Sequence, residues 1–163
     1  DRRQRQMCIR DSYERLPRGG AEGVIVVAVN RHNELLLIRE YAAGFHEIQL
    51  TLPKGLVEPQ ESMEAAASRE LAEEVGFAAN RTELVKRLTL APSHMGFSIN
   101  VVFATDLYPH QLQGDEPEPI ELVPWPLQRL DELLHNEEFC EARAIAALAL
   151  CRPLFSQLLE ATD

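Results

Sequence analysis

The chain has 163 residues, about the length of one ordinary domain, and 45% of them are hydrophobic, which excludes a wholly disordered protein. Its formal net charge of -10 argues against broad binding to nucleic acid or to an anionic membrane, because either partner would be repelled at long range. A small anionic substrate is compatible with this charge if cations bridge it to the protein.

The cysteines favour a reducing compartment. Cys8, Cys140 and Cys151 have no metal-ligand spacing, and an odd number of cysteines is a poor disulfide framework. We therefore expect free thiols and a cytoplasmic protein. No apolar run approaches membrane-spanning length, so we expect no membrane partner. Residues 1–12 lack a periodic pattern, and we expect residues 13–163 to form one domain.

The first third of the chain predicts short strands. Residues 24–29 form a continuous apolar, β-branched run, and a second apolar run at 35–38 follows the polar residues 30–33. Two buried strands joined by a tight turn fit this pattern. Residues 47–52 predict a third strand, closed by a turn at Pro53-Lys54-Gly55.

A helix is predicted over residues 62–75, where the composition changes to Ala, Glu, Met and Leu. Ser62 is suited to cap its N-terminus, and Gly76 stands just past its C-terminus. Ala67, Leu71 and Val75 form the stripe expected to face the core.

The rest of the chain predicts strands followed by helices. Strands are expected at 84–90, 97–104 and near 120–123, and helices at 127–134 and 142–159, the last bent at Pro153. Residues 114–119 read as a rigid acidic loop. The interleaving of strands and helices indicates an α/β or α+β fold with a mixed sheet between helices.

The face of the predicted helix opposite its apolar stripe is acidic. Arg69, Glu70, Glu73 and Glu74 fall together on it, because they are three or four residues apart. Solvated carboxylates at this spacing repel weakly, but enclosed ones roughly 4 Å apart repel by about 4 kcal/mol at an effective dielectric of about 20. An enclosed face would need a cation, and Mg²⁺ or Mn²⁺ suits carboxylate oxygens. An exposed helix with surface acids is the alternative.

The spacing around this helix matches a known motif. Gly55, Glu61 and the run Arg69 to Phe77 occupy every fixed position of the Nudix box, so the chain resembles the Nudix hydrolases over residues 55–77. The resemblance implies a Nudix-fold α/β/α sandwich with a mixed β-sheet. It also implies that Glu70 and Glu74 bind the metal, and that Glu73 is a further ligand or a supporting group.

The same resemblance implies two further parts of the metal site. The backbone carbonyl of Lys54 or of Gly55 would complete the ligand set. Arg69 would orient the acids by pairing with Glu73 or Glu61.

Short stretches outside the box resemble the Nudix subgroup that hydrolyses ADP compounds, in order from about Tyr13 to Leu154. They include 37–41, 91–93, 106–109, 114–119 and 141–143. This resemblance implies metal-dependent hydrolysis of ADP-ribose, of diadenosine di- and triphosphate, and of NADH, with release of AMP. It also implies that the protein forms a homodimer and that its small-molecule partners are nucleotide diphosphates.

Candidate catalytic and substrate-binding residues follow from this subgroup. Related ADP-ribose hydrolases activate the attacking water with a Glu on the late acidic loop, which here is Glu116 or Glu118; a solvated loop is the alternative. The list of candidate substrate contacts is Arg39, Tyr41, Lys54 and His94. Arg39 could equally be a solvent-facing strand end. His94 stands where relatives that cleave diadenosine polyphosphates have a Tyr.

Two other functions stay open at the level of sequence. The chain could be a different Nudix diphosphatase, acting on diadenosine tetraphosphate or RNA caps, although its acidic charge disfavours RNA. It could also be a Nudix-fold sensor that binds a nucleotide without turnover, although all the carboxylates of the box are present.

Overall fold

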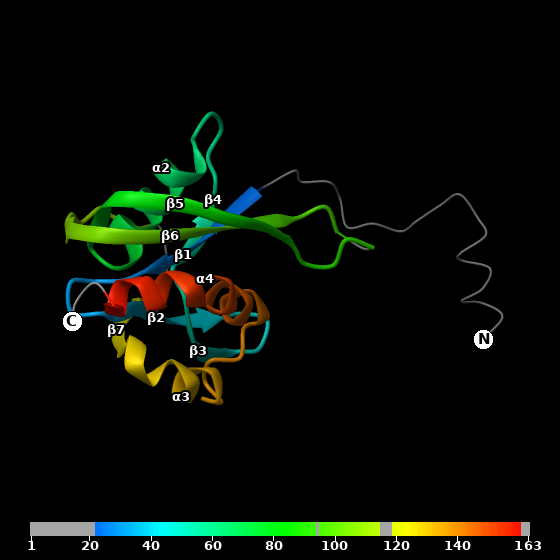
Figure 1. Ribbon diagram of the computed structural model, residues 1–163. Coiled ribbons are helices and arrows are strands. Elements are labelled where there is room, and N and C mark those ends of the chain that lie inside the picture. The colour runs from blue at the N-terminus through cyan, green and yellow to red at the C-terminus, as the bar shows by residue number, and fades with distance from the viewer. Residues whose placement is uncertain (1–21, 94, 115–118, 161–163) are drawn as a thin grey trace, which may run out of the picture.

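A computed structural model describes residues 22–93, 95–114 and 119–160, which build two β-sheets with helices packed against them (Figure 1). The four-stranded sheet has the order β4-β1-β6-β5 and the three-stranded sheet the order β3-β2-β7. The strands are β1 (Glu22–Ala28), β2 (Glu34–Ala42), β3 (Glu47–Thr51), β4 (Lys54–Leu56), β5 (Phe77–Thr89), β6 (Ser98–Pro109) and β7 (Glu121–Pro126). The helices are α2 (Met63–Glu74), the 3-10 turn η1 (Leu127–Arg129), α3 (Leu130–Leu134) and α4 (Ala142–Glu160).

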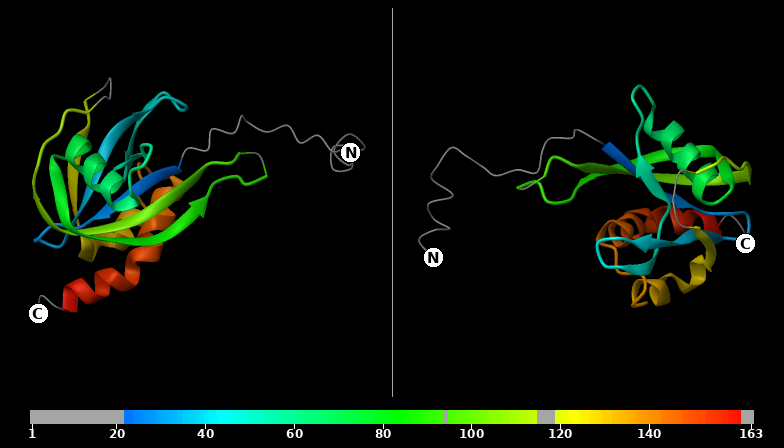
Figure 2. Two further views of the ribbon diagram at one scale, coloured as in Figure 1. Left: turned by 90° about the horizontal axis from the view of Figure 1, so that it is seen from above. Right: turned by 180° about the vertical axis from the view of Figure 1, so that it is seen from behind.

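Strand β1 lies inside the four-stranded sheet and is buried on both faces. It runs parallel to β6 and antiparallel to β4, which makes the sheet mixed, as expected. Val24 and Val26 pack in the core cluster that contains α2, whereas Ile25 and Val27 pack in the cluster that contains α4. Figures 1 and 2 show these helices on opposite sides of the sheet. Burial on both sides explains why the run reads as continuously apolar rather than alternating.

The turn at 30–33 connects the two sheets. Asn33 adopts a left-handed conformation with φ 56°, and the Asn30 side chain accepts from the backbone N–H of Glu34 at 3.1 Å. The following strand, β2, is also buried on both faces over its first half: Leu36 and Ile38 join the α2 cluster. Successive side chains therefore point alternately toward and away from α2, and this alternation decides what the end of β2 contributes to the site.

Two sequence expectations about strands are wrong in their bounds. The turn expected at Pro53-Lys54-Gly55 is a strand from Lys54, because Lys54 to Leu56 pair with β1. Strand β5 begins at Phe77 rather than at Leu84, and it pairs along its length with β6. β5 is an edge strand whose side chains are mostly exposed, so its first half lacks the long apolar run or the strict alternation that predicts a strand.

The sequence expectation that no apolar run approaches membrane-spanning length is wrong for helix α4, which is long and apolar enough to cross a membrane by length and composition. Its Ala144, Ala147, Leu148 and Phe155 lie in the core cluster with β1, so we interpret it as a core helix. Pro153 stands inside the helix, which continues from Ala142 to Glu160.

Burial separates the two cysteines that the structure describes. Cys151 is buried in α4, and burial raises the pKa of its thiol to about 12, whereas Cys140 is exposed. Because the thiolate is the reactive form, we expect a thiol reagent to modify Cys140 rapidly and Cys151 only after unfolding. Peptide mapping by mass spectrometry, with and without guanidinium, measures this. Equal labelling of both in the folded protein would contradict the prediction.

Candidate active site

The acidic helix α2 begins and ends as its sequence predicts. The Ser62 side chain accepts from the backbone N–H of Ala65 at 3.1 Å, and Gly76 has φ 74° just beyond the C-terminal cap Val75. Leu71 is fully buried against β1 and β2. The core thereby fixes one face of the helix, which leaves the acidic face toward β4 and the loop before the helix.

The chain that leaves β6 closes the C-terminal end of α2. The Gln111 Nε2 donates to the carbonyls of Ala72 at 3.2 Å and Glu73 at 3.4 Å, and the Leu112 backbone N–H donates to Ala72 at 2.9 Å. These carbonyls have no acceptor role inside the helix, so the contacts satisfy groups that would otherwise be left open. The turn of α2 that bears Glu73 and Glu74 is held from outside the helix.

Glu70 is a nearly buried carboxylate, with 7% of the residue exposed. It lies against β4 so closely that a Cβ added at Gly55 would overlap its carboxylate. Burial raises the pKa of Glu70, and the neighbouring Arg69 opposes this effect. Glycine is therefore required at position 55 by the approach of this side chain, in addition to any demand of the backbone.

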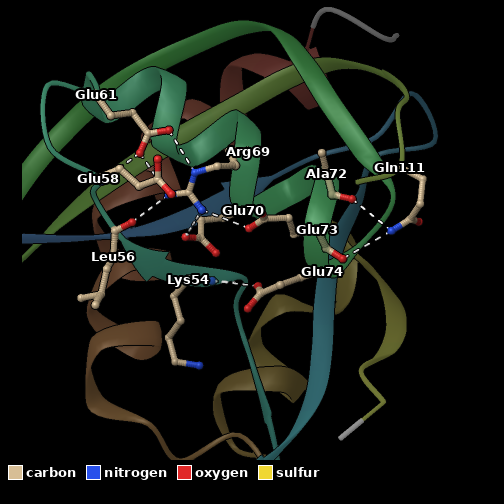
Figure 3. A network of polar contacts seen from close by, with 10 residues as sticks. All are labelled: Lys54, Leu56, Glu58, Glu61, Arg69, Glu70, Ala72, Glu73, Glu74 and Gln111. Carbon is tan, nitrogen blue, oxygen red and sulfur yellow. Dashed lines mark hydrogen bonds and ion pairs between the residues drawn. The ribbon is translucent and has the colours of Figure 1, made fainter. Parts of the chain in front are cut away.

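Arg69 connects Glu61, in the loop before α2, to Glu70 and Glu73 on the helix (Figure 3). Its Nε and Nη2 donate to the two oxygens of Glu61, each at 3.0 Å. Its Nη1 donates to Glu70 at 2.8 Å and to Glu73 at 3.0 Å, and Nη2 also donates to the Leu56 carbonyl at 2.8 Å. The forked pairing lowers the pKa of Glu61 and raises that of Arg69. All five guanidinium N–H groups are thus used within the protein.

Glu74 is held differently, because its contact is with backbone. Its Oε2 accepts from the N–H of Lys54 at 3.0 Å. Burial raises the pKa of the Glu74 carboxyl to about 8, against the opposing effect of Lys54, and the charges of Glu70 and Glu40 raise it further. Among the described residues, the positive charge of Lys54 does not offset the burial of this carboxylate.

The side chain of Lys54 forms an ion pair with Glu40 of β2. Both side chains are largely enclosed, with 15% of Lys54 and 25% of Glu40 exposed. Glu40 had no place among the residues expected from the motif. Strand alternation was the signal that could have found it, because Glu40 follows Leu36 and Ile38 on the face of β2 turned toward α2.

These residues suit a hard divalent cation in their chemistry. Glu70 and Glu74 offer carboxylate oxygens, and burial raises the pKa of each, so a cation bound there would stabilise their charged forms. Within the described ranges, however, no three His, Cys, Asp or Glu side chains gather around one point. Arg69 holds Glu70 and Glu73 while Glu74 faces the Lys54 N–H, so the acids would have to turn from these partners to share an ion.

Two predicted substrate contacts lie apart from these acids. Arg39 pairs with Glu138 at 3.0 Å and with Glu121 at 3.4 Å, on the other face of β2 from Glu40. The hydrogen bond to Glu138 is the main cause of its raised pKa. Tyr41, 43% exposed, makes a 3.0 Å hydrogen bond with the His46 ring.

The remaining predicted site residues are Glu116, Glu118 and His94. They lie outside the residues that the structure describes. Their roles therefore stay predictions from the sequence.

Comparison with known proteins agrees with the motif and the fold. A family model of the NUDIX domain matches residues 20–148. The ADP compounds hydrolase NudE of Escherichia coli (strain K12) is 46% identical over 144 residues, which cover 88% of this chain and 77% of that protein. The ADP-ribose pyrophosphatase of Bacillus subtilis (strain 168) is 24% identical over 127 residues, covering 77% of this chain and 69% of that protein. A crystal structure of an ADP compounds hydrolase has 44% sequence identity and a TM-score of 0.84, and the match covers 88% of this chain and 77% of that one.

Proposed function

We propose that this chain, which belongs to the Nudix hydrolase family, hydrolyses the diphosphate bond of ADP-containing compounds and releases AMP. Candidate substrates are ADP-ribose, diadenosine di- and triphosphate, and NADH. The observation that carries the proposal is the 46% identity, across most of the chain, to a protein named ADP compounds hydrolase. Such substrates share an ADP moiety, so one adenylate pocket and one diphosphate site can serve them all.

We assign the metal site to the acidic face of α2. Glu70 and Glu74 would hold Mg²⁺ or Mn²⁺, with Glu73 as a further ligand or supporting group. A bound divalent ion neutralises a diphosphate and lowers the pKa of a water molecule. The protein's own part is to keep the carboxylates in place, and the contacts of Arg69 with Glu61, Glu70 and Glu73 support a positioning role for it.

Roles at the substrate follow from position and residue type. Lys54 would contact a phosphate, because its ammonium is close enough to Glu74 to lower the pKa of that carboxyl but pairs with Glu40. Glu116 or Glu118 would accept the proton of the attacking water. Tyr41 and His94 would contact the adenine. Arg39 would contact the substrate directly only after its ion pairs with Glu121 and Glu138 are broken.

A cytoplasmic homodimer is the proposed setting. The free thiols of Cys140 and Cys151 support a reducing compartment. The family resemblance supports the dimer, for which light scattering should give twice the mass of 18.4 kDa. A monomeric mass would refute the proposed dimer and leave the proposed reaction untouched.

A substrate panel tests the proposed reaction. AMP release is measured from ADP-ribose, NADH, diadenosine triphosphate and diadenosine tetraphosphate, with Mg²⁺ or Mn²⁺ and with EDTA, for the wild type and for Glu74→Gln. We expect metal-dependent turnover of the first three substrates and its loss in the variant. Turnover of the tetraphosphate alone would replace the proposal with a different Nudix diphosphatase. Binding without turnover of any substrate would instead indicate a sensor.

A further inference from the structure

The ion pair between Lys54 and Glu40 lies beside the acidic face but outside the Nudix box. Lys54 connects the two, because its backbone N–H donates to Glu74 while its ammonium pairs with Glu40. In Figure 3 the Lys54 side chain runs away from the carboxylates of α2. Lys54 thus holds the Glu74 carboxylate with its backbone N–H, while its own ammonium lies apart from that carboxylate.

In the arrangement that the structure shows, Arg69 has no donor left for a substrate. Its five donors are taken by Glu61, Glu70, Glu73 and the Leu56 carbonyl. Arg39 lies on the other face of β2, engaged by Glu121 and Glu138. The Lys54 ammonium has three donor hydrogens, and its hydrogen-bond partner among the residues that the structure describes is Glu40. It therefore keeps donors for a phosphate oxygen.

Lysine is a poor choice for a fixed charge unless something holds it. Its side chain has four rotatable bonds and loses rotamer entropy when it is immobilised. An unheld ammonium beside Glu74 would also turn toward the carboxylates and oppose the binding of a cation there. A carboxylate on the opposite side, fixed by a strand, removes both problems.

Glu40 occupies such a position. It stands on β2 two residues after Ile38, whose side chain is fully buried in the cluster that also contains Leu71 of α2. The backbone of β2 at this point is paired with β3, as Glu40 lies opposite Gln49. The Gln49 amide donates to Glu47 at 2.9 Å, so it has a different partner on its own strand.

From this geometry we propose that Glu40 is a positioning residue, which holds the Lys54 ammonium away from Glu74 and ready for a phosphate of the substrate diphosphate. The proposal rests on the proposed function only for the identity of the substrate. The binding role itself can be measured without turnover.

A double-mutant cycle tests it, with ADP as the probe. Calorimetry in Mg²⁺ compares the wild type, Glu40→Gln, Lys54→Met and the double variant. Lys54→Met is expected to weaken ADP binding about 10-fold, because a charge-assisted contact is lost. Glu40→Gln should weaken it roughly 3-fold or more. The double variant should bind like Lys54→Met, because in this proposal Glu40 reaches the ADP phosphate through Lys54.

The kinetic counterpart separates positioning from a general structural effect. With the best substrate of the panel, Glu40→Gln should raise KM and leave kcat nearly unchanged, the pattern of lost uniform binding. Glu40→Asp, which keeps the charge, should recover part of the loss. Glu47→Gln, which removes an exposed acid from the neighbouring strand, is the matched control and should behave like the wild type.

Three results would overturn the proposal: wild-type ADP binding in Glu40→Gln, wild-type ADP binding in Lys54→Met, or effects of the two changes that multiply. If Glu40→Gln does not fold, as judged by circular dichroism, Glu40→Asp and Lys54→Met complete the same comparison. Normal ADP binding in the wild type without AMP release from any substrate would refute the proposed function and leave this assignment intact.

Discussion

Glu74→Gln is expected to lower the rate of AMP release by about 10³-fold or more and also to raise the unfolding temperature of the metal-free protein. The first effect follows from the loss of a metal ligand, because a divalent ion stabilises the charge of the transition state by several kcal/mol. The second follows from burial. Glutamine has the shape of glutamate and keeps an oxygen that can accept from the Lys54 N–H, but it carries no charge in an enclosed site.

The sign of the stability effect follows from the pKa. Burial raises the pKa of Glu74 from 4.5 to about 8 in the folded protein. The folded state therefore binds a proton that the unfolded state has released, so stability is lost as the pH rises from 4.5 through about 8. The variant does not titrate at this position. Its advantage should be small at pH 4.5 and reach several degrees in unfolding temperature at pH 8.

Thermal unfolding in EDTA at pH 5 and at pH 8 measures the difference, and Mg²⁺ should then stabilise the wild type more than the variant. Equal unfolding temperatures at both pH values would contradict an enclosed, uncompensated carboxylate. Retained AMP release in a folded variant would remove Glu74 from the metal site.

Gly55→Ala is expected to lower turnover about 100-fold or more, although it adds a single methyl group. The new Cβ would overlap the carboxylate of Glu70, so that side chain must move. Its movement also disturbs the contact of Glu70 with Arg69 at 2.8 Å. A ligand displaced by about 1 Å is enough to cost two orders of magnitude in rate.

Gly44→Ala is the matched control, since an added Cβ there has no heavy atom within 4 Å. AMP release and Mn²⁺ binding, followed by electron paramagnetic resonance, are measured for both variants. The Gly55 variant should lose Mn²⁺ affinity together with activity, whereas the control should keep both. Activity of Gly55→Ala within twofold of the wild type would show that Glu70 is not needed at its present position.

Periodicity and composition were sufficient to predict the helices and strands that bury apolar residues. The helix at Met63–Glu74 and the strand at Glu22–Ala28 lie where the sequence predicts them, because both have long apolar faces or runs. The start of β5 and the whole of β4 were not predictable in this way. One is an exposed edge strand and the other has only three residues, so their pairing with β6 and β1 defines them.

In the candidate site, too, some features follow from the sequence and others depend on tertiary packing. The spacing of Gly55, Glu61, Arg69, Glu70 and Glu74 is a property of the sequence alone, and it determined the family and the acidic face of one helix. Whether those acids are exposed or enclosed depends on what packs against them. Only the tertiary structure places β4 against Glu70, encloses Glu74 and brings Glu40 to Lys54.

The sequence by itself therefore determined the family, the main elements and the face of α2 that carries the chemistry, because these depend on spacing along one chain segment. The tertiary structure decided the burial, the raised pKa of Glu74, the separation of Arg39 from these acids and the partner of Lys54. Those properties arise between β2, β4 and α2, whose side chains meet only when the two sheets and the helix pack together. Local periodicity carries no information about such contacts.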